Sequence, residues 1–290
     1  MNPKEIGSLI KLLDDTDNEV YTHIEEKLLS LGNHVIPFLE TAWSQSFDAL
    51  LQERIERIIH RIQFDSLKVE LRKWFKEESK DLLKGTILIA RYQYPDLDEE
   101  KIRTTIEQIK REIWLELNDK LTALEKVRII NHIFFSVYNF SGNTANYHAP
   151  QNSYINNVLE SKKGNPLSLS IIYSLIAQGL ALPIYGVNLP EHFILAYKDD
   201  QPILSAAAEE ISPRILFYIN VFSKGMVFNR KEIDAFLKQL KIKPTMEYYE
   251  PCSNIAILQR LVRNLMFSYH KLGGHTDKIS ELQELMDALS

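Results

Sequence analysis

The chain has 290 residues, of which 45% are hydrophobic and 25% are charged, and its formal net charge is −5. This length can supply more than one domain with a sizeable core, and the composition is typical of a globular protein. The acidic balance argues against a nucleic-acid-binding protein, which needs a basic surface to neutralise phosphates.

Three features of the sequence bear on its cellular location. A single cysteine, Cys252, excludes an internal disulfide and favours a reducing compartment. The first residues show no basic-then-apolar signal pattern. No apolar run approaches the ~20 residues that a membrane-spanning helix needs. We therefore expect a soluble, cytoplasmic protein that makes no membrane contact.

Residues 1–140 are predicted to be almost wholly helical. The segment "KEIGSLIKLLDD" places four apolar residues on one face, Ile6, Leu9, Ile10 and Leu13. A second amphipathic helix stops at Gly32. A helix, a polar turn and a second helix followed by "VIPFLETAW" are similar to a HEAT-like repeat. We expect a helical scaffold here, and a helical surface that docks a partner is the alternative.

The character of the chain changes after residue 140. The turn-rich segment "SGNTANYHAPQ" precedes a short helix that Asn152 or Ser153 can cap. Pro166 then stands in the first turn of a helix that continues, almost entirely apolar, to Leu180. A helix that is apolar on all sides must be buried, so we expect it at the centre of its domain.

Four strand-like segments follow, and helices complete the chain. The strand candidates are "IYGVNL", "HFILAY", "QPILSA" and "RILFYINVF", and the helix candidates are "RKEIDAFLKQL", "NIAILQRLVRNLMFSYHKL" and "TDKISELQELMDAL". The pattern predicts an α+β protein with a buried helix packed on a small antiparallel sheet. We predict a helical domain at residues 1–140, a mixed core at 141–250 and C-terminal helices at 251–290 that pack on the core.

The mixed region has the layout of a cysteine–histidine active site but lacks a cysteine. Such a site needs a nucleophile at a helix N-terminus, a histidine within hydrogen-bond reach and a third group that orients the histidine. Here the helix begins in "GNPLSLS", and His192 follows on the segment predicted as the next strand. The order fits this plan, whereas the nucleophile is missing.

The runs "NSYINNVLESKKGNPLSLS", "VNLPEHF" and "FYINVF" resemble the transglutaminase-like SirB family. The resemblance implies a transglutaminase-like core in which Pro166 stands at the nucleophile position. His192 matches the catalytic histidine, and Asn220 takes the place of the orienting aspartate. Gly164 matches a glycine of the signature, whereas Glu191 replaces the glycine that usually precedes the histidine.

Because proline cannot act as a nucleophile, we expect a catalytically inactive protein that keeps the groove as a binding or regulatory site. The helix N-terminus would bind an anionic or carbonyl-bearing group, such as a peptide segment. A protein or peptide partner is therefore expected, and the oligomeric state stays open. The predicted groove consists of Asn152, Gly164, Asn165, Ser168, Pro190, Glu191 and His192.

Two alternatives remain open at this stage. One is an unorthodox amide or ester hydrolase in which His192 acts with Ser168, Ser170 or Cys252. Against it, we expect both serines to bond backbone carbonyls inside the buried helix and the thiol to be inert. The other is a pure scaffold that acts through its N-terminal helices. The histidines are scattered without nearby acids at ligand spacing, so we expect no metal and no cofactor.

Overall fold

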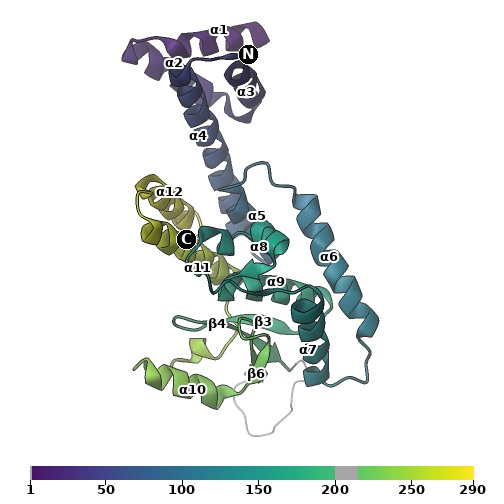
Figure 1. Cartoon of the computed structure of the whole chain (residues 1–290). Helices are drawn as coiled ribbons and strands as arrows, with labels where there is room; N and C mark the ends of the chain where they lie inside the picture. The colour runs from purple at the N-terminus through teal and green to yellow at the C-terminus, as the bar shows by residue number, and fades with distance from the viewer. Residues whose placement is uncertain (1, 200–214) are drawn as a thin grey trace. The chain divides into compact units, whose positions relative to one another are not determined.

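The computed structural model describes residues 2–199 and 215–290 (Figure 1). It divides into two compact units, Met1–Lys73 and Trp74–Ser290. The predicted strand "QPILSA" lies outside the described residues. The division into parts at 1–140, 141–250 and 251–290 stays a prediction.

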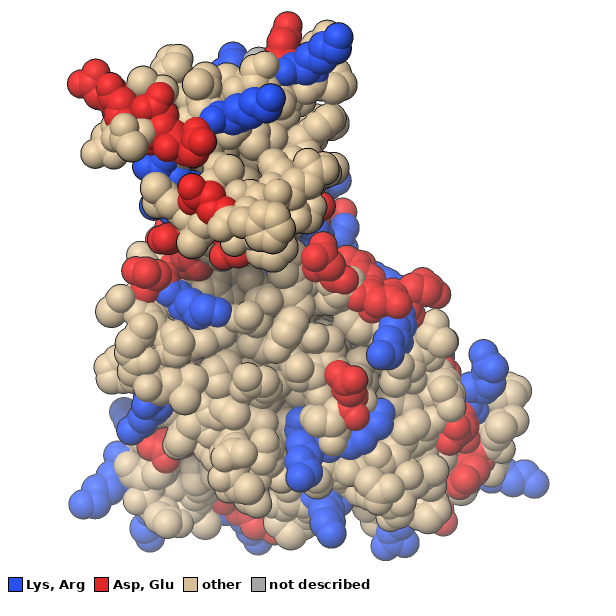
Figure 2. Space-filling model, turned by 45° about the horizontal axis from the view of Figure 1, so that its top comes forward, with Lys and Arg blue, Asp and Glu red and all other residues tan. Residues whose placement is uncertain are grey.

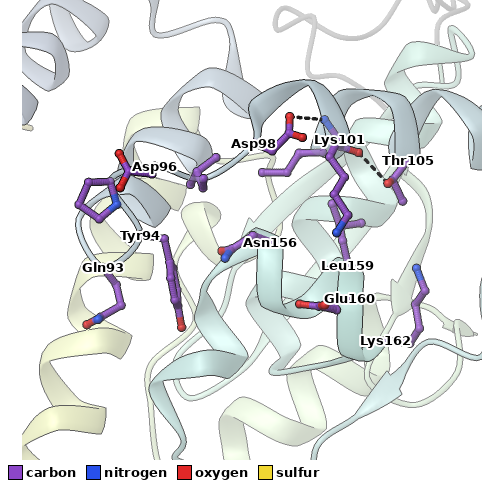
Figure 3. A pocket seen from close by; sticks show the side chains of 13 residues that line it. Gln93, Tyr94, Asp96, Asp98, Lys101, Thr105, Asn156, Leu159, Glu160 and Lys162 are labelled. Carbon is purple, nitrogen blue, oxygen red and sulfur yellow. Dashed lines mark hydrogen bonds between the residues drawn. The ribbon is translucent and has the colours of Figure 1, made fainter.

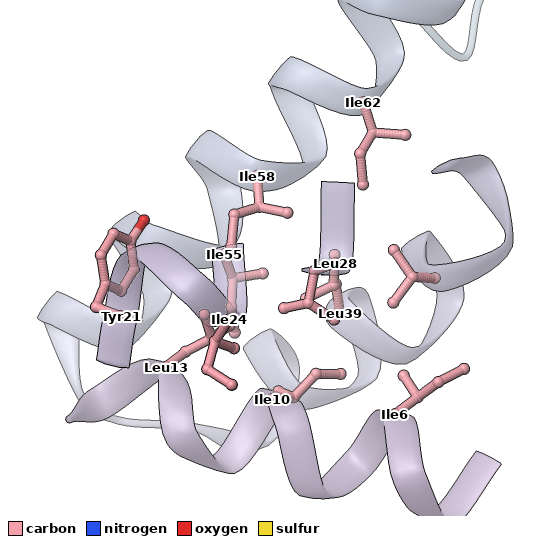
Figure 4. Packing of buried hydrophobic residues seen from close by; sticks show 11 residues of the cluster. Ile6, Ile10, Leu13, Tyr21, Ile24, Leu28, Leu39, Ile55, Ile58 and Ile62 are labelled. Atoms are coloured by element: carbon pink, nitrogen blue, oxygen red, sulfur yellow. The ribbon is translucent and has the colours of Figure 1, made fainter. Parts of the chain in front are cut away.

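Unit 1 is a small helical unit. Asn2 and Asp17 begin the first two long helices by accepting hydrogen bonds from backbone N–H groups of the first turn. Figure 4 shows how isoleucine and leucine side chains from all four long helices meet in one core. The likeness to a HEAT repeat stays a prediction. The helices are α1 (Pro3–Lys11), α2 (Asn18–Ser30), α3 (Ile36–Gln45) and α4 (Ala49–Lys73), with 3-10 turns at Leu12–Asp14 and Gly32–Val35.

Unit 2 contains the mixed part of the chain, and most of its residues are helical. A π-helical segment, Trp74–Glu78, opens it, and a second one, His132–Val137, follows α7. Two 3-10 turns lie at Pro150–Ser153 and Met246–Tyr248. The α-helices are α5 (Leu82–Arg91), α6 (Glu99–Glu116), α7 (Ala123–Asn131), α8 (Ile155–Ser161), α9 (Pro166–Gly179), α10 (Arg230–Gln239), α11 (Asn254–Leu272) and α12 (Thr276–Asp287).

The described strands form two small sheets, which confirms the predicted mixture of helices with a small sheet. The larger sheet is antiparallel with the order β3-β4-β5-β6, and the smaller one pairs β1 with β2 in parallel. A shift of register between Tyr197 and Lys198 marks the pairing of β4 with β5. The strands are β1 (Ser141–Gly142), β2 (Lys163–Gly164), β3 (Ile184–Asn188), β4 (Phe193–Lys198), β5 (Ile215–Asn220) and β6 (Met226–Phe228).

Helices α9 and α10 lie on opposite sides of the larger sheet (Figure 1). Ile233 and Leu237 of α10 pack against Val187, Ile194 and Tyr218 of the strands. Helix α9 packs against β3 and β4 and is buried along almost its whole length, as an apolar helix requires. The N-terminus of α9 is therefore held by a rigid core.

The surface gives two further observations. Among the described residues, no helix combines the length and apolarity that crossing a bilayer requires. On the face drawn in Figure 2, the Lys and Arg side chains of the described part are interspersed with Asp and Glu. A continuous basic surface of the kind that binds nucleic acid is not seen on that face.

Candidate functional site

The N-terminus of α9 is fixed by a reciprocal pair of hydrogen bonds. The side-chain oxygen of Asn165 accepts from the Ser168 N–H at 2.9 Å, and the Ser168 hydroxyl oxygen accepts from the Asn165 N–H at 3.0 Å. This capping box satisfies two backbone donors at the helix start. Pro166 occupies the first helical position, where its missing N–H costs nothing. The sequence therefore starts α9 at a defined residue.

Asn152 ties the preceding loop to this helix start. Its amide nitrogen donates to the carbonyls of Asn146 at 2.7 Å and Tyr147 at 3.0 Å, and its oxygen accepts from Asn143 at 2.9 Å. The Ser168 hydroxyl donates to the Asn152 carbonyl at 2.6 Å. We call Asn143, Asn152, Ser153, Asn165 and Ser168 the cap network, because each of them bonds within it.

Gly164 is required by close packing next to the cap network. A Cβ atom at this position would lie 2.6 Å from the Ser168 hydroxyl oxygen and 3.0 Å from a methyl group of Val158. Both distances are shorter than packed atoms allow. The glycine therefore lets Ser168 fold back over the helix start, and three of the predicted groove residues, Asn152, Gly164 and Ser168, serve the structure here.

A hollow of about 480 Å³ opens at the start of α9. We call it the Arg260 hollow. Pro166, at the position of the expected nucleophile, lines it and offers neither a hydroxyl nor a thiol. Asn165 and Leu167 also face it, and its lining further includes Tyr147, His148, Glu191, Arg260, Asn264 and Phe267.

Arg260 of α11 supplies a half-buried positive charge to this hollow. Its Nη1 donates to the side chain of Asn188 and, at 2.5 Å, to the Leu189 carbonyl. Among the described residues, no acceptor is bonded to its Nε or Nη2, and no carboxylate forms an ion pair with it. Burial lowers the pKa of the guanidinium, since removal from water disfavours the charge. An anion bound to Arg260 would compensate for the hydration that the guanidinium has lost on burial.

Aromatic side chains form the rim of the Arg260 hollow. The rings of Tyr147 and His148 meet edge to face at 5.2 Å, and His148 meets Phe267 at 5.4 Å. Tyr147 is 43% exposed and Phe267 is 50% exposed. Exposed aromatic groups beside a fixed cation are typical of a surface that binds a peptide.

The loop between β3 and β4 carries the predicted histidine. The His192 N–H donates to the Pro190 carbonyl at 2.7 Å, which closes a γ-turn around Glu191. Glu191 has a φ of 57°, in the left-handed region that favours glycine. His192 therefore lies in the loop just before β4, whereas the sequence pattern placed it on the strand. A turn of this kind favours glycine, the residue that Glu191 replaces in the signature that the chain resembles.

His192 faces a second hollow, of about 240 Å³, which we call the His192 hollow. Its ring meets Phe236 edge to face at 4.8 Å. Desolvation by this packing lowers the pKa of His192, and the positive charge of Arg260 lowers it further. The hollow also contains Asn220, whose side-chain oxygen accepts from the Ser223 N–H at 3.1 Å. The lining further includes Met226, Phe228 and Glu232.

The three positions of the expected catalytic triad are thus divided between two hollows. His192 and Asn220 share one, and Pro166 lines the other. Of the predicted groove residues, Asn165 and Glu191 belong to the Arg260 hollow, and Pro190 lies in the γ-turn. Their role in binding stays a prediction.

Sequence reasoning missed the residues that give the Arg260 hollow its character. Arg260, Asn264 and Phe267 come from α11, and Tyr147 and His148 come from the loop before α8. The amphipathic pattern of α11 showed an ordinary polar face, so no local signal distinguished Arg260 from a solvated arginine. Only the tertiary packing of α11 against the β3–β4 loop reveals it.

The hydroxyl and thiol groups near α9 are poor nucleophiles. The Ser168 hydroxyl donates to backbone carbonyls, as predicted, whereas the fully buried Ser170 hydroxyl has no partner, so the prediction for Ser170 was wrong. Burial raises the pKa of the Cys252 thiol to about 11, which disfavours the reactive thiolate. Across residues 2–199 and 215–290, no cluster of His, Cys, Asp and Glu could hold a metal ion.

A known protein family covers the part of the chain that holds the sheet and most of both hollows. The family model described as transglutaminase-like superfamily matches residues 100–263, which include both hollows except Asn264, Phe267 and Ser268 of the Arg260 hollow. The chain belongs to the transglutaminase-like superfamily. The SirB family name stays a prediction.

Relatives are found in bacteria and in animals. A UPF0162 protein of Xylella fastidiosa is 34% identical over 211 residues, which is 70% of this chain and 68% of the relative. A UPF0162 protein of Vibrio cholerae is 22% identical over 190 residues, 63% of this chain and 64% of the relative. F-box only protein 21 of Mus musculus is 30% identical over 158 residues, 54% of this chain and 24% of that protein. No solved structure matches the chain.

Proposed function

We propose that the protein is a catalytically inactive transglutaminase-like protein that binds a carboxylate-bearing protein or peptide segment in the Arg260 hollow. The observation that carries the proposal is the half-buried Arg260, whose Nε and Nη2 have no acceptor among the described residues, next to Pro166 at the nucleophile position. A desolvated guanidinium without a counter-ion favours a carboxylate, which can accept two parallel N–H bonds.

The neighbouring groups support a peptide as the source of that carboxylate. Exposed Tyr147 and Phe267 offer apolar contact area beside the charge, and Asn264 offers a neutral polar group. Glu191 also lines the hollow, and its negative charge would disfavour a second carboxylate on the ligand. We therefore expect preference for a peptide with a single terminal carboxylate and a basic or neutral residue near it.

The hydrolase alternative gains no support from the geometry of the serines. The Ser168 hydroxyl is committed to two carbonyl oxygens, and Ser170 is 0% exposed. A serine nucleophile needs a free hydroxyl within hydrogen-bond reach of its base. A broad panel of fluorogenic amides and esters is expected to show no turnover that depends on His192.

Binding can be tested with one apolar peptide made in two forms, with a free C-terminal carboxylate and with a C-terminal amide. Fluorescence anisotropy should show binding of the acid and at least tenfold weaker binding of the amide. Phe267→Ala removes an exposed rim residue and should weaken binding, whereas Trp114→Ala removes an aromatic side chain that is 64% exposed elsewhere in unit 2 and should not. Equal binding of acid and amide would contradict the proposal.

The same assay tests whether the N-terminal helices act as a docking surface, as a pure scaffold would require. Phe47 is fully exposed, and the nearby Trp43 and Leu50 are 40% and 49% exposed, so unit 1 presents apolar groups of its own. We propose this trio as the docking surface of the helical region, which we take to be HEAT-like. We further propose that the chain is of the SirB type, by the resemblance of its mixed region, and that it is cytoplasmic. If Phe47→Ser abolishes binding of the peptide and Phe267→Ala does not, the scaffold function is favoured.

A further inference from the structure

A third hollow of unit 2 is larger than the two described above and shares no lining residue with them. It has a volume of about 690 Å³ and lies between α8, the first half of α6 and the residues that join α5 to α6 (Figure 3). This volume is within the range of ~300–1,000 Å³ that small-molecule sites occupy. We call it the Lys162 hollow, and the residues that matter for its chemistry are Tyr94, Lys101, Asn156, Leu159, Glu160 and Lys162.

Lys162 contributes a half-buried ammonium group without an oxygen partner among the described residues. Its Nζ lies 4.8 Å from the ring centroid of Phe140 and 5.6 Å from that of Tyr138. These contacts are cation–π interactions, which attract the charge but give its N–H groups no oxygen acceptor. Burial lowers the pKa of Lys162, which shows that the charge has lost solvent without gaining a counter-ion.

The backbone of Lys162 allows a sharp test of its side chain. The residue caps the end of α8 with φ 59° and ψ 17°, a left-handed conformation that usually belongs to glycine or asparagine. Lys224 and Lys241 have similar φ values of 55° and 57°, so the conformation alone indicates no function. It does make glycine compatible with position 162.

Asn156 provides an acceptor on the same helix. Its side-chain oxygen is buried and has no hydrogen-bond partner in the described part of the chain. A buried acceptor without a donor is unfavourable, and a ligand N–H group would satisfy it. Figure 3 shows Asn156 and Lys162 on opposite sides of Leu159 and Glu160, so the acceptor and the cation lie at separate places in the hollow.

Charges of both signs line the hollow without forming ion pairs with one another. Lys101 reaches into it from α6, and Glu160 and Asp96 add carboxylates. Among the described residues, no salt bridge joins these lysines to these acids. Separated, unpaired charges favour a ligand that carries both signs, because a ligand of one sign would be repelled by one set.

We propose that the Lys162 hollow binds a short peptide in its zwitterionic form, with apolar side chains, because only a peptide separates its amine and carboxylate widely enough to reach both groups. The ligand carboxylate would bond the ammonium groups of Lys162 and Lys101. The ligand amino group would donate to the Asn156 oxygen, near the carboxylate of Glu160. An apolar side chain would pack on Leu159 and the ring of Tyr94, which is held edge-on against Tyr154 at 5.5 Å.

Isothermal titration calorimetry on the full chain tests the ligand class with four probes. L-leucine and the dipeptide leucyl-leucine carry both charges, isovalerate lacks the amine and isopentylamine lacks the carboxylate. We expect leucyl-leucine to bind, and L-leucine and each single-charge analogue to bind at least tenfold more weakly. Failure of leucyl-leucine to bind at millimolar concentration, or equal binding of L-leucine or isovalerate, would overturn the proposal.

Lys162→Gly is the decisive variant, because glycine fits the left-handed conformation and the fold should be kept. We expect at least tenfold weaker binding together with a melting temperature that is unchanged or higher. Lys163→Gln removes the neighbouring, exposed lysine and should leave binding unchanged. Asn156→Leu should weaken the zwitterion more than isovalerate, because only the zwitterion uses the Asn156 oxygen. Unchanged affinity in Lys162→Gly would refute the site, whatever the peptide assay on the Arg260 hollow shows.

Discussion

The close packing of Gly164 gives a prediction whose magnitude follows from distances. A Cβ atom at residue 164 would lie 2.6 Å from the Ser168 hydroxyl oxygen, 3.0 Å from Val158 and 3.1 Å from Leu169. Overpacking of a buried site costs ~1–3 kcal/mol. If Ser168 rotates away instead, the Asn165 N–H and the Asn152 carbonyl lose its hydroxyl and keep only the long bond of 3.4 Å that joins them, at a cost of ~1–3 kcal/mol. Since the two responses are alternatives, we expect Gly164→Ala to destabilise unit 2 by about 1–3 kcal/mol.

The assay must report on unit 2 alone. Tryptophan fluorescence in a Trp43→Phe background follows Trp74 and Trp114, both of which belong to unit 2. The expected loss corresponds to a melting temperature about 2–12 °C lower for a unit of this size. Gly179→Ala, on the same helix as Ser168, is the matched control, because its Cβ atom meets only the flexible side chain of Lys110 at 2.9 Å.

A double-mutant cycle identifies the atom responsible. Ser168→Ala removes the hydroxyl oxygen that the new Cβ atom would meet, so Gly164→Ala should cost less in that background. We expect the double variant to fall short of the sum of the single variants by at least ~1 kcal/mol. Strict additivity, or a loss below ~0.5 kcal/mol for Gly164→Ala alone, would refute the reasoning that Gly164 makes room for the cap network.

Three further predictions concern the residues around the β3–β4 loop. In a thermal melt, Glu191→Gly should stabilise the protein by ~0.5–1 kcal/mol, because the left-handed strain at φ 57° costs more than the extra chain entropy of glycine. Glu191→Ala keeps a Cβ atom and should give no gain in the same measurement. The pKa of His192 is lowered in the folded state, so its contribution to stability is present above the unfolded pKa of ~6.5 and is lost as the pH falls below that value. His192→Gln should therefore flatten this part of a curve of unfolding free energy against pH, measured by urea denaturation. Cys252, with a thiol pKa of about 11, should react with a thiol reagent at pH 8 on the order of 10²-fold more slowly than after unfolding, and rapid labelling of the native protein would revive the thiol as a nucleophile.

Local patterns were sufficient to predict the centre of the fold. The apolar run after Pro166 required a buried helix, and the structure has α9 buried against β3 and β4. Pro166 was also predicted in the first turn of this helix, where the structure has it. Both features depend on neighbours in sequence, which is why they could be predicted. The cap expected at Asn152 or Ser153 was wrong, because α8 begins after Tyr154 without a side-chain cap.

The division of the site into two hollows could not be predicted in that way. It depends on the γ-turn at Glu191, which points His192 toward Phe236, and on Arg260, which holds the other side of the same loop. A glutamate at positive φ gives no local signal, because most such residues adopt ordinary backbone conformations. The role of Arg260 arises from packing between segments distant in sequence.

Pro166 and Glu191 together support binding through shape as the role of the site. Relative to the signature that the chain resembles, both positions carry a different residue. Proline fits the first turn of α9 without strain, and Glu191 adopts a left-handed backbone in spite of its side chain. The helix start and the loop are thus well defined, and Pro166 itself offers no nucleophile. This combination supports the proposal of a site that binds a ligand without reacting with it. Binding depends on where Arg260 and the aromatic rim of its hollow are held. Catalysis would also need a thiol or hydroxyl beside His192.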